Sequence, residues 1–161
     1  MRPMLDPEIR ARITWWKIQG LRQTDPFIKF FMLYMCLDAW ITSESEEEKD
    51  SKKLDWLINN ENDLKKYWEE VKCGEQFQSW LNGFLQRGVV YDMRPKHRGE
   101  FISLTNTDNF SQVVRFIYQI RCNLFHGEKS PVDSNDKQLV GWAGNILGKW
   151  IEWTLTKTRQ K

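Results

Sequence analysis

Arg121 and His126 are the two residues of this chain whose types and spacing best fit phosphate and proton-transfer chemistry. Arginine keeps its charge at neutral pH, and its planar guanidinium group matches the geometry of a phosphate. Histidine titrates near neutral pH and can accept or donate a proton. The pair therefore fits the attack of an RNA 2′-hydroxyl on the adjacent phosphate, with the histidine moving the proton and the arginine stabilising the negative charge. That reaction needs no metal ion.

The element that must position this pair is a helix expected to begin at Asp108, as its cap, and to end at Phe125 or His126. Gly127 then follows, in a place typical of a helix C-terminus, and the negative end of the helix favours the protonated imidazole. At about 100° per residue, one face of this helix is apolar: Phe110, Val113, Val114, Ile117, Ile120 and Leu124. Arg121 falls within that face, where a guanidinium group is costly unless something pairs with it.

The spacing of the pair raises a geometric problem. On a regular helix, five residues separate the directions of the Arg121 and His126 side chains by about 140°. Either the helix unwinds near Asn123, or the site is completed from elsewhere, as in a two-fold dimer that brings two copies of each group together. A structural interpretation stays open, in which Arg121 bonds backbone carbonyls or a buried acid and His126 only caps its helix. Composition and periodicity alone favour that structural interpretation.

The sequence around the pair resembles the signature of a known family. The stretch from Tyr118 to Lys129, YQIRCNLFHGEK, is similar to the R-x(4–6)-H motif of the HEPN superfamily. It particularly resembles short bacterial members with the approximate pattern R-x-N-L-x-H-G-x-K. The similarity extends over about residues 110–153, including the last helix and its spacing, while the earlier helices agree only in class.

This resemblance implies a helical bundle that forms a homodimer, with both motifs facing one cleft. It also implies a metal-independent endoribonuclease without a cofactor, often a toxin or a phage-defence protein, with RNA as substrate and an antitoxin or defence-system protein as a further partner. By motif position, Arg121 and His126 are the catalytic pair, Asn123 supports them, and Lys129 contacts phosphate. One departure is Cys122, because active members commonly have Asn, Asp or His after the arginine. The alternative is therefore a catalytically inactive HEPN module that binds a partner protein, a nucleotide or RNA.

The rest of the chain predicts an all-α bundle of about five to six helices in a single domain, 1–161, with a short irregular or β-hairpin excursion near residues 89–106. Helices are expected over 8–19, ended by Gly20, and from Pro26, capped by Asp25, to about Thr42. Residues 43–53 are expected to be a solvated polar loop. Further helices are expected over about 54–60, 64–71 and 77–87, the last ended by Gly88, and a long helix from Ser134 or Asn135.

The excursion near residues 89–106 contains a cluster of basic residues. Between two β-prone segments lie Arg94, Lys96 and Arg98. Such a cluster fits contacts to an RNA phosphate backbone, and it fits an exposed basic turn equally well. His97 stands among these cations and is not a catalytic candidate.

Composition narrows the possible functions further. The net charge of +2 is too small for a strong overall field for nucleic acid, so an anion site must come from local clustering. The three cysteines form no CxxC pair, which predicts neither a disulfide framework nor a zinc site and favours a reducing, cytoplasmic setting. The first residues contain no apolar signal segment, and no apolar run approaches the ~20 residues that span a bilayer. We therefore expect no metal, no cofactor and no membrane insertion.

Overall fold

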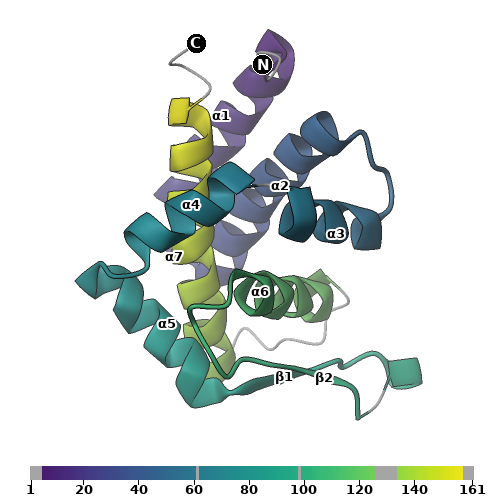
Figure 1. The fold of residues 1–161 in the computed structure, drawn as a ribbon, viewed down its shortest axis with the longest axis vertical. Helices are drawn as coiled ribbons and strands as arrows, with labels where there is room; N and C mark the ends of the chain where they lie inside the picture. Colours follow the sequence, from purple (N-terminus) through teal and green to yellow (C-terminus); the bar gives the residue numbers. More distant parts are fainter. Residues whose placement is uncertain (1–4, 61, 98, 126–133, 158–161) are drawn as a thin grey trace.

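The computed structural model describes residues 5–60, 62–97, 99–125 and 134–157, and within them it has seven α-helices and one β-hairpin (Figure 1). The prediction of an all-α bundle with a short hairpin is confirmed, with seven helices rather than five to six. The helices are α1 Pro7–Arg22, α2 Pro26–Ser45, α3 Asp50–Asn60, α4 Asn62–Val71, α5 Glu75–Arg87, α6 Phe110–Phe125 and α7 Ser134–Lys157. The antiparallel strands are β1 Val89–Tyr91 and β2 Phe101–Ser103, with the short 3₁₀ helix η1 Pro95–His97 between them.

Helix α7 is the axis of the bundle, with α1, α2, α4 and α5 packed along it (Figure 1). Its contacts are built from large aromatic side chains. The Trp150 ring meets the rings of Trp68 from α4 and Phe110 from α6, each 5.9 Å away between centroids. Trp68 and Trp150 are both fully buried. Many of the tryptophans and phenylalanines therefore join helices that are distant in the sequence. Among the described residues, no helix combines the length and the apolar character that crossing a bilayer requires.

The first two helices show one confirmed boundary and one correction. Asp25 caps α2, because its carboxylate accepts hydrogen bonds from the backbone N–H groups of Phe27 and Ile28. The prediction that Gly20 ends the first helix is wrong, since α1 continues to Arg22. Gly20 instead lies buried where α1 meets α2, and a Cβ there would lie only 3.1 Å from Leu33. The glycine allows the two helices to approach closely.

The predicted solvated loop over residues 43–53 is also wrong in extent. Helix α2 continues to Ser45 and α3 begins at Asp50, so only residues 46–49 connect them. Glu46, the C-cap of α2, has a left-handed backbone with a φ of 57°. Lys53 on α3 pairs with Asp38 on α2 at 3.1 Å, which holds the two helices together. Much of residues 43–53 is therefore helical, and Lys53 in this stretch contacts α2.

Helix α6 lies between α3 and the hairpin (Figure 1). The predicted cap, Asp108, is wrong, since Asn109 accepts the hydrogen bond from the Gln112 N–H and Asp108 pairs with Lys72 at 3.1 Å. The predicted end of α5 is confirmed, because Gly88 has a φ of 71° at its C-cap. The last helix, predicted to start at Ser134 or Asn135, is described from Ser134 onward.

Two helical glycines give a matched test of how tightly α5 packs on α7. A Cβ at Gly83 would lie 2.6 Å from the Trp142 ring, whereas a Cβ at Gly141 would meet Pro26 at an ordinary 3.8 Å. We expect Gly83→Ala to lower the free energy of unfolding by about 1–3 kcal/mol through overpacking. Gly141→Ala should leave it unchanged or raise it by up to about 1 kcal/mol through helix propensity. Urea unfolding of both variants measures the difference, and equal effects would contradict this packing.

Candidate functional site

Arg121 is held at the C-terminal end of α6 by an acidic residue from another helix. Its side chain is 17% exposed, and its Nη2 lies 2.9 Å from a carboxylate oxygen of Asp50, the first residue of α3. The guanidinium group in the apolar face of α6 therefore has a counter-charge, as the structural interpretation of the sequence requires. A charge-assisted pair of this kind is stronger than a neutral hydrogen bond, and partial burial reduces its screening by solvent.

Three aromatic rings surround the same guanidinium group. The Arg121 carbon Cζ lies 4.5 Å from the centre of the Phe125 ring, 5.5 Å from that of Tyr34 and 5.9 Å from that of Tyr118. Cation–π contacts of this kind contribute about 0.5–2 kcal/mol each, more when they are desolvated. The Nε atom of Arg121 is buried without a hydrogen-bond partner. Aromatic contacts and one carboxylate thus compensate for the burial of this cation.

The charges at this position reinforce one another. Burial acts to lower the pKa of Arg121, but nearby Tyr34 and Asp50 raise it, and the net shift is upward. Burial raises the pKa of Tyr118 to about 12 and that of Tyr34 still further, so both hydroxyl groups stay neutral near pH 7. Arg121 is therefore a fixed cation among neutral rings, and neither tyrosine supplies a base at neutral pH.

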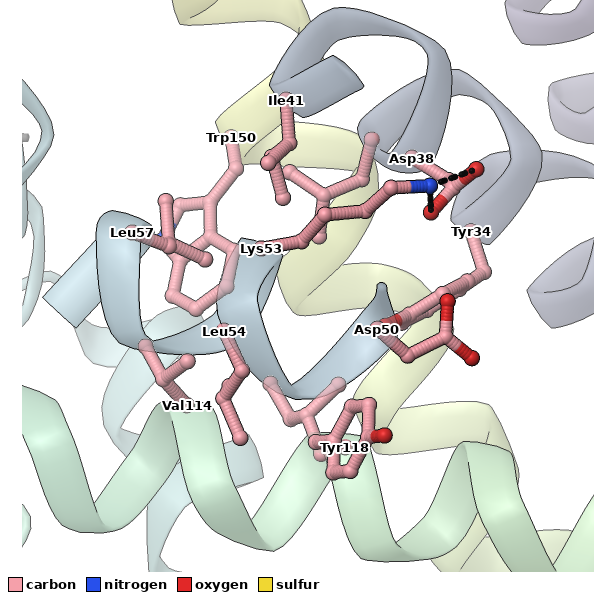
Figure 2. A pocket seen from close by; sticks show the side chains of 12 residues that line it. Tyr34, Asp38, Ile41, Asp50, Lys53, Leu54, Leu57, Val114, Tyr118 and Trp150 are labelled. Atoms are coloured by element: carbon pink, nitrogen blue, oxygen red, sulfur yellow. Dashed lines mark hydrogen bonds and ion pairs between the residues drawn. The ribbon is translucent and has the colours of Figure 1, made fainter. Parts of the chain in front are cut away.

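A small cavity lies next to the Arg121–Asp50 pair, between α2, α3 and α6 (Figure 2). Figure 2 shows Asp50 near Tyr34 and Tyr118, with the Lys53–Asp38 ion pair above Tyr34. Its volume is about 20 Å³, enough for one water molecule but not for a nucleotide. This cavity is therefore too small to hold a nucleotide.

Asn123, predicted to support the catalytic pair, fixes the hairpin to α6. Its side chain is 1% exposed, and its amide nitrogen donates a hydrogen bond to the Tyr91 carbonyl at 2.8 Å. Its oxygen accepts hydrogen bonds from the Met93 N–H at 3.3 Å and from the Gln119 amide at 3.0 Å. The protein itself thus uses both ends of this side chain.

The hairpin residues predicted to bind RNA have different surroundings. Arg94 forms a two-pronged pair with the buried carboxylate of Asp92, with its closest contact at 2.6 Å. Lys96 is exposed and pairs with no other described residue. Arg98 lies outside the described residues, as do His126, Gly127 and Lys129. The described part of the site therefore consists of Arg121, Asn123, Arg94 and Lys96.

The upward pKa shifts of Arg94 and Arg121 share one contributing neighbour, the buried thiol of Cys122. Cys122 is close enough to both guanidinium groups to raise the pKa of each. Asn123, one residue further, holds the strand that leads to Arg94. The last turn of α6 therefore connects the motif to the basic end of the hairpin.

Asp50 is the site residue that the sequence did not identify. It lies in the charge-dense stretch that was expected to be a solvated loop, and no local pattern separates it from its acidic neighbours. Tyr118 and Phe125 could have been identified, because they stand three residues before and four residues after Arg121 on one helix face. Pairing with a residue far away in the sequence leaves no such signal.

One further group of side chains has metal-ligand chemistry. The ligand atoms of Asp92, His97 and Glu100 lie within 4.8 Å of one another at the end of the hairpin. His97 Nδ1 lies 3.0 Å from the Glu100 carboxylate, and Arg94 bonds both oxygens of Asp92. The guanidinium charge of Arg94 next to this group disfavours a bound cation.

Comparisons of the chain with protein-family models, with curated protein sequences and with solved structures gave no match. The resemblance to the HEPN motif is therefore one of sequence pattern alone.

Asn123→Ala should show how much the clamp on the hairpin contributes to stability. The change leaves the Tyr91 carbonyl, the Met93 N–H and the Gln119 amide without their partner, and unsatisfied buried groups cost about 1–3 kcal/mol. We expect the free energy of unfolding, measured in urea, to fall by about 2 kcal/mol. Asn59→Ala, at an exposed position at the end of α3, is the matched control and should change it by less than about 0.5 kcal/mol. An equally small effect at Asn123 would contradict its role as a clamp.

The Asp92–Arg94 pair should make stability depend on pH in the acidic range. Hydrogen bonds from Arg94 lower the pKa of Asp92 to about 2, so the stabilisation is complete above the unfolded pKa of about 4 and is lost as the pH falls towards 2. Arg94→Met should therefore be much less stable than the wild type at pH 6, and the difference should narrow at pH 3, where the unpaired Asp92 of the variant binds a proton. Urea unfolding at both pH values measures this. Lys96→Met, the control, removes an unpaired cation. Its difference in stability from the wild type should be about the same at pH 6 and pH 3.

Proposed function

We propose that this protein is a metal-independent endoribonuclease of the HEPN type, in which His126 transfers the proton and Arg121 stabilises the phosphate. The observation that carries the proposal is the R-x(4)-H motif, whose arginine lies in the last turns of α6. Asp50 and aromatic rings hold Arg121 there, five residues before His126 in the chain. A cation fixed before the substrate arrives needs little reorganisation during the reaction, which is what stabilisation of a developing negative charge requires.

The proposed reaction is a transesterification within the RNA. The 2′-hydroxyl loses its proton to a base and attacks the adjacent phosphorus, the bond to the 5′-oxygen breaks, and that oxygen receives a proton. The products are a 2′,3′-cyclic phosphate and a 5′-hydroxyl. Arg121 has five N–H donors, of which one nitrogen faces Asp50, so the exposed part of the group can still meet a phosphate oxygen. Lys129, Arg94, Lys96 and Arg98 are the proposed contacts to the RNA backbone.

Two copies of the chain would supply both the base and the acid. Each chain has only one histidine in the motif, whereas the reaction needs a proton acceptor on one side and a proton donor on the other. The surface beside the end of α6 supports a homodimer, because an apolar hollow there contains exposed side chains. Its lining residues are Phe27, Ile28, Phe31, Leu124 and Phe125. An apolar surface of this kind next to the motif is suited to a second copy of the chain.

A catalytically inactive module that binds a partner protein, a nucleotide or RNA is the second candidate. The observation in its favour is that Asp50 and the aromatic rings already engage Arg121, while the protein itself uses both ends of Asn123. Cys122, in place of the usual polar residue, is buried and offers no hydrogen-bonding amide. In either case the proposed setting is the cytoplasm, in a toxin–antitoxin or phage-defence system with a matching partner protein.

His126→Ala should abolish cleavage of a mixed RNA pool in EDTA, or slow it at least about 100-fold, because loss of general acid–base catalysis typically costs that much. His97→Ala is the matched control, since it removes the other histidine of the chain, and it should leave cleavage unchanged. Circular dichroism and sedimentation of all three proteins check that fold and assembly are retained. Cleavage by His126→Ala at the wild-type rate would exclude the proposed catalytic role. A folded wild-type protein that cuts no RNA would favour the binding module.

A further inference from the structure

The β-hairpin presents two aromatic side chains to solvent, directly opposite each other. In the register of the two strands, Tyr91 on β1 is the partner of Phe101 on β2. Their side chains are 53% and 54% exposed, and Phe101 is the most exposed of the nine phenylalanines. Val90, one residue earlier on β1, is buried and points the opposite way. The hairpin thus buries one face against α6 and leaves an aromatic face open.

Folding alone does not explain this aromatic pair. The two rings contact each other edge to face, with 5.8 Å between their centres, and a cross-strand pair of this kind contributes only about 0.2–1 kcal/mol. In an edge-to-face contact at least one ring keeps a face that its partner does not cover. Met93, two residues further along the chain, is exposed as well. Large apolar side chains gathered on a small exposed surface commonly mark a place where something binds.

Hydrogen bonds at both ends of the hairpin fix the backbone that carries the aromatic face. Asn123 bonds the Tyr91 carbonyl and the Met93 N–H, and the Asp92 N–H donates to the Glu100 carbonyl at 2.9 Å. At the other end of the hairpin, the Leu104 N–H donates to the Gly88 carbonyl at 2.8 Å. A surface held in this way loses little conformational freedom on binding.

The charges next to the aromatic face indicate the kind of ligand. Arg94 and Lys96 follow Tyr91 within a few residues, and Lys96 is exposed and unpaired among the described residues. Aromatic faces beside cations are the arrangement with which proteins bind unpaired nucleic acid, because the bases stack on the rings and the cations meet the phosphates. An apolar protein partner would not account for the neighbouring cations.

We infer that the exposed Tyr91–Phe101 face of the hairpin is a stacking surface for unpaired RNA bases. The inference rests on the proposed ribonuclease function and extends it. Asn123 belongs to the last turn of α6, so its hydrogen bonds fix the hairpin, and with it the stacking surface, to the helix that carries Arg121. An RNA strand whose bases stack on Tyr91 and Phe101 would be held on the hairpin, which is bonded to the same helix that carries Arg121. The specificity for single-stranded RNA would then come from this face.

Binding of a fluorescent oligouridine with 2′-O-methyl groups, which cannot be cleaved, tests the inference by fluorescence anisotropy. The wild type should bind, and Tyr91→Leu and Phe101→Leu should each weaken binding about tenfold, as expected for loss of one stacked base. Tyr91→Phe and Phe101→Tyr should bind like the wild type, because stacking needs an aromatic ring and not only an apolar side chain. Trp15→Leu removes an equally exposed aromatic residue, 54% exposed on α1, and should have no effect.

Three results would overturn the inference: no binding by the wild type, leucine variants that bind as tightly as the wild type, or an equal loss with Trp15→Leu. Leucine variants that change only the sedimentation of the protein would assign the face to a second copy of the chain instead. The experiment is independent of cleavage. Weaker binding by the leucine variants, with no cleavage of natural RNA by the wild type, would support the stacking surface and refute the nuclease. Cleavage that depends on His126, with no effect of the leucine variants on binding, would support the nuclease and refute the stacking surface.

Discussion

The guanidinium group of Arg121 sets the main constraint on this structure, because it places a permanent charge in the apolar face of α6. A charge in that position is tolerated only with a counter-charge and with polarisable neighbours. Asp50 supplies the first at 2.9 Å, and the rings of Tyr34, Tyr118 and Phe125 supply the second. These groups come from α2, α3 and α6, so one side chain determines how three helices meet. The middle of α2 and the first residue of α3 are therefore brought together beside Arg121.

The last turn of α6 organises a second side of the molecule in a different way. Asn123 lies two residues after Arg121, which turns it about 200° around the helix. There it binds the hairpin backbone through neutral hydrogen bonds, in place of an ion pair. One helical turn thus carries a charged anchor for α3 and a neutral anchor for the hairpin. Because both sides of this turn are bonded to other parts of the protein, α6 is buried over a wider face than its apolar stripe.

Local signals in the sequence predicted the parts of the fold that depend on neighbouring residues. The start of α2 follows from Asp25 and Pro26, and the hairpin follows from two β-prone segments with a turn between them. Gly20 misled the prediction because its helix continues where α2 approaches closely, a reason that appears only in three dimensions. Asp108 and Asn109 are both good caps by type, and the distant Lys72 decides between them by pairing with Asp108. The Asp50–Arg121 pair was unpredictable for the same reason, while the position of Arg121 in the apolar stripe already indicated that a partner must exist.

The pairing of Arg121 with Asp50 would affect the proposed catalysis in two opposite ways. The pair lowers the net charge that a phosphate meets at the motif, which weakens simple electrostatic attraction. It also fixes the guanidinium group before any ligand arrives, so less side-chain freedom is lost in the complex. Asp50 engages only one nitrogen of the guanidinium group, and 17% of the side chain stays exposed. For a phosphate that comes within hydrogen-bonding distance of the exposed edge of the group, this fixed position favours the charge stabilisation that the proposed reaction requires.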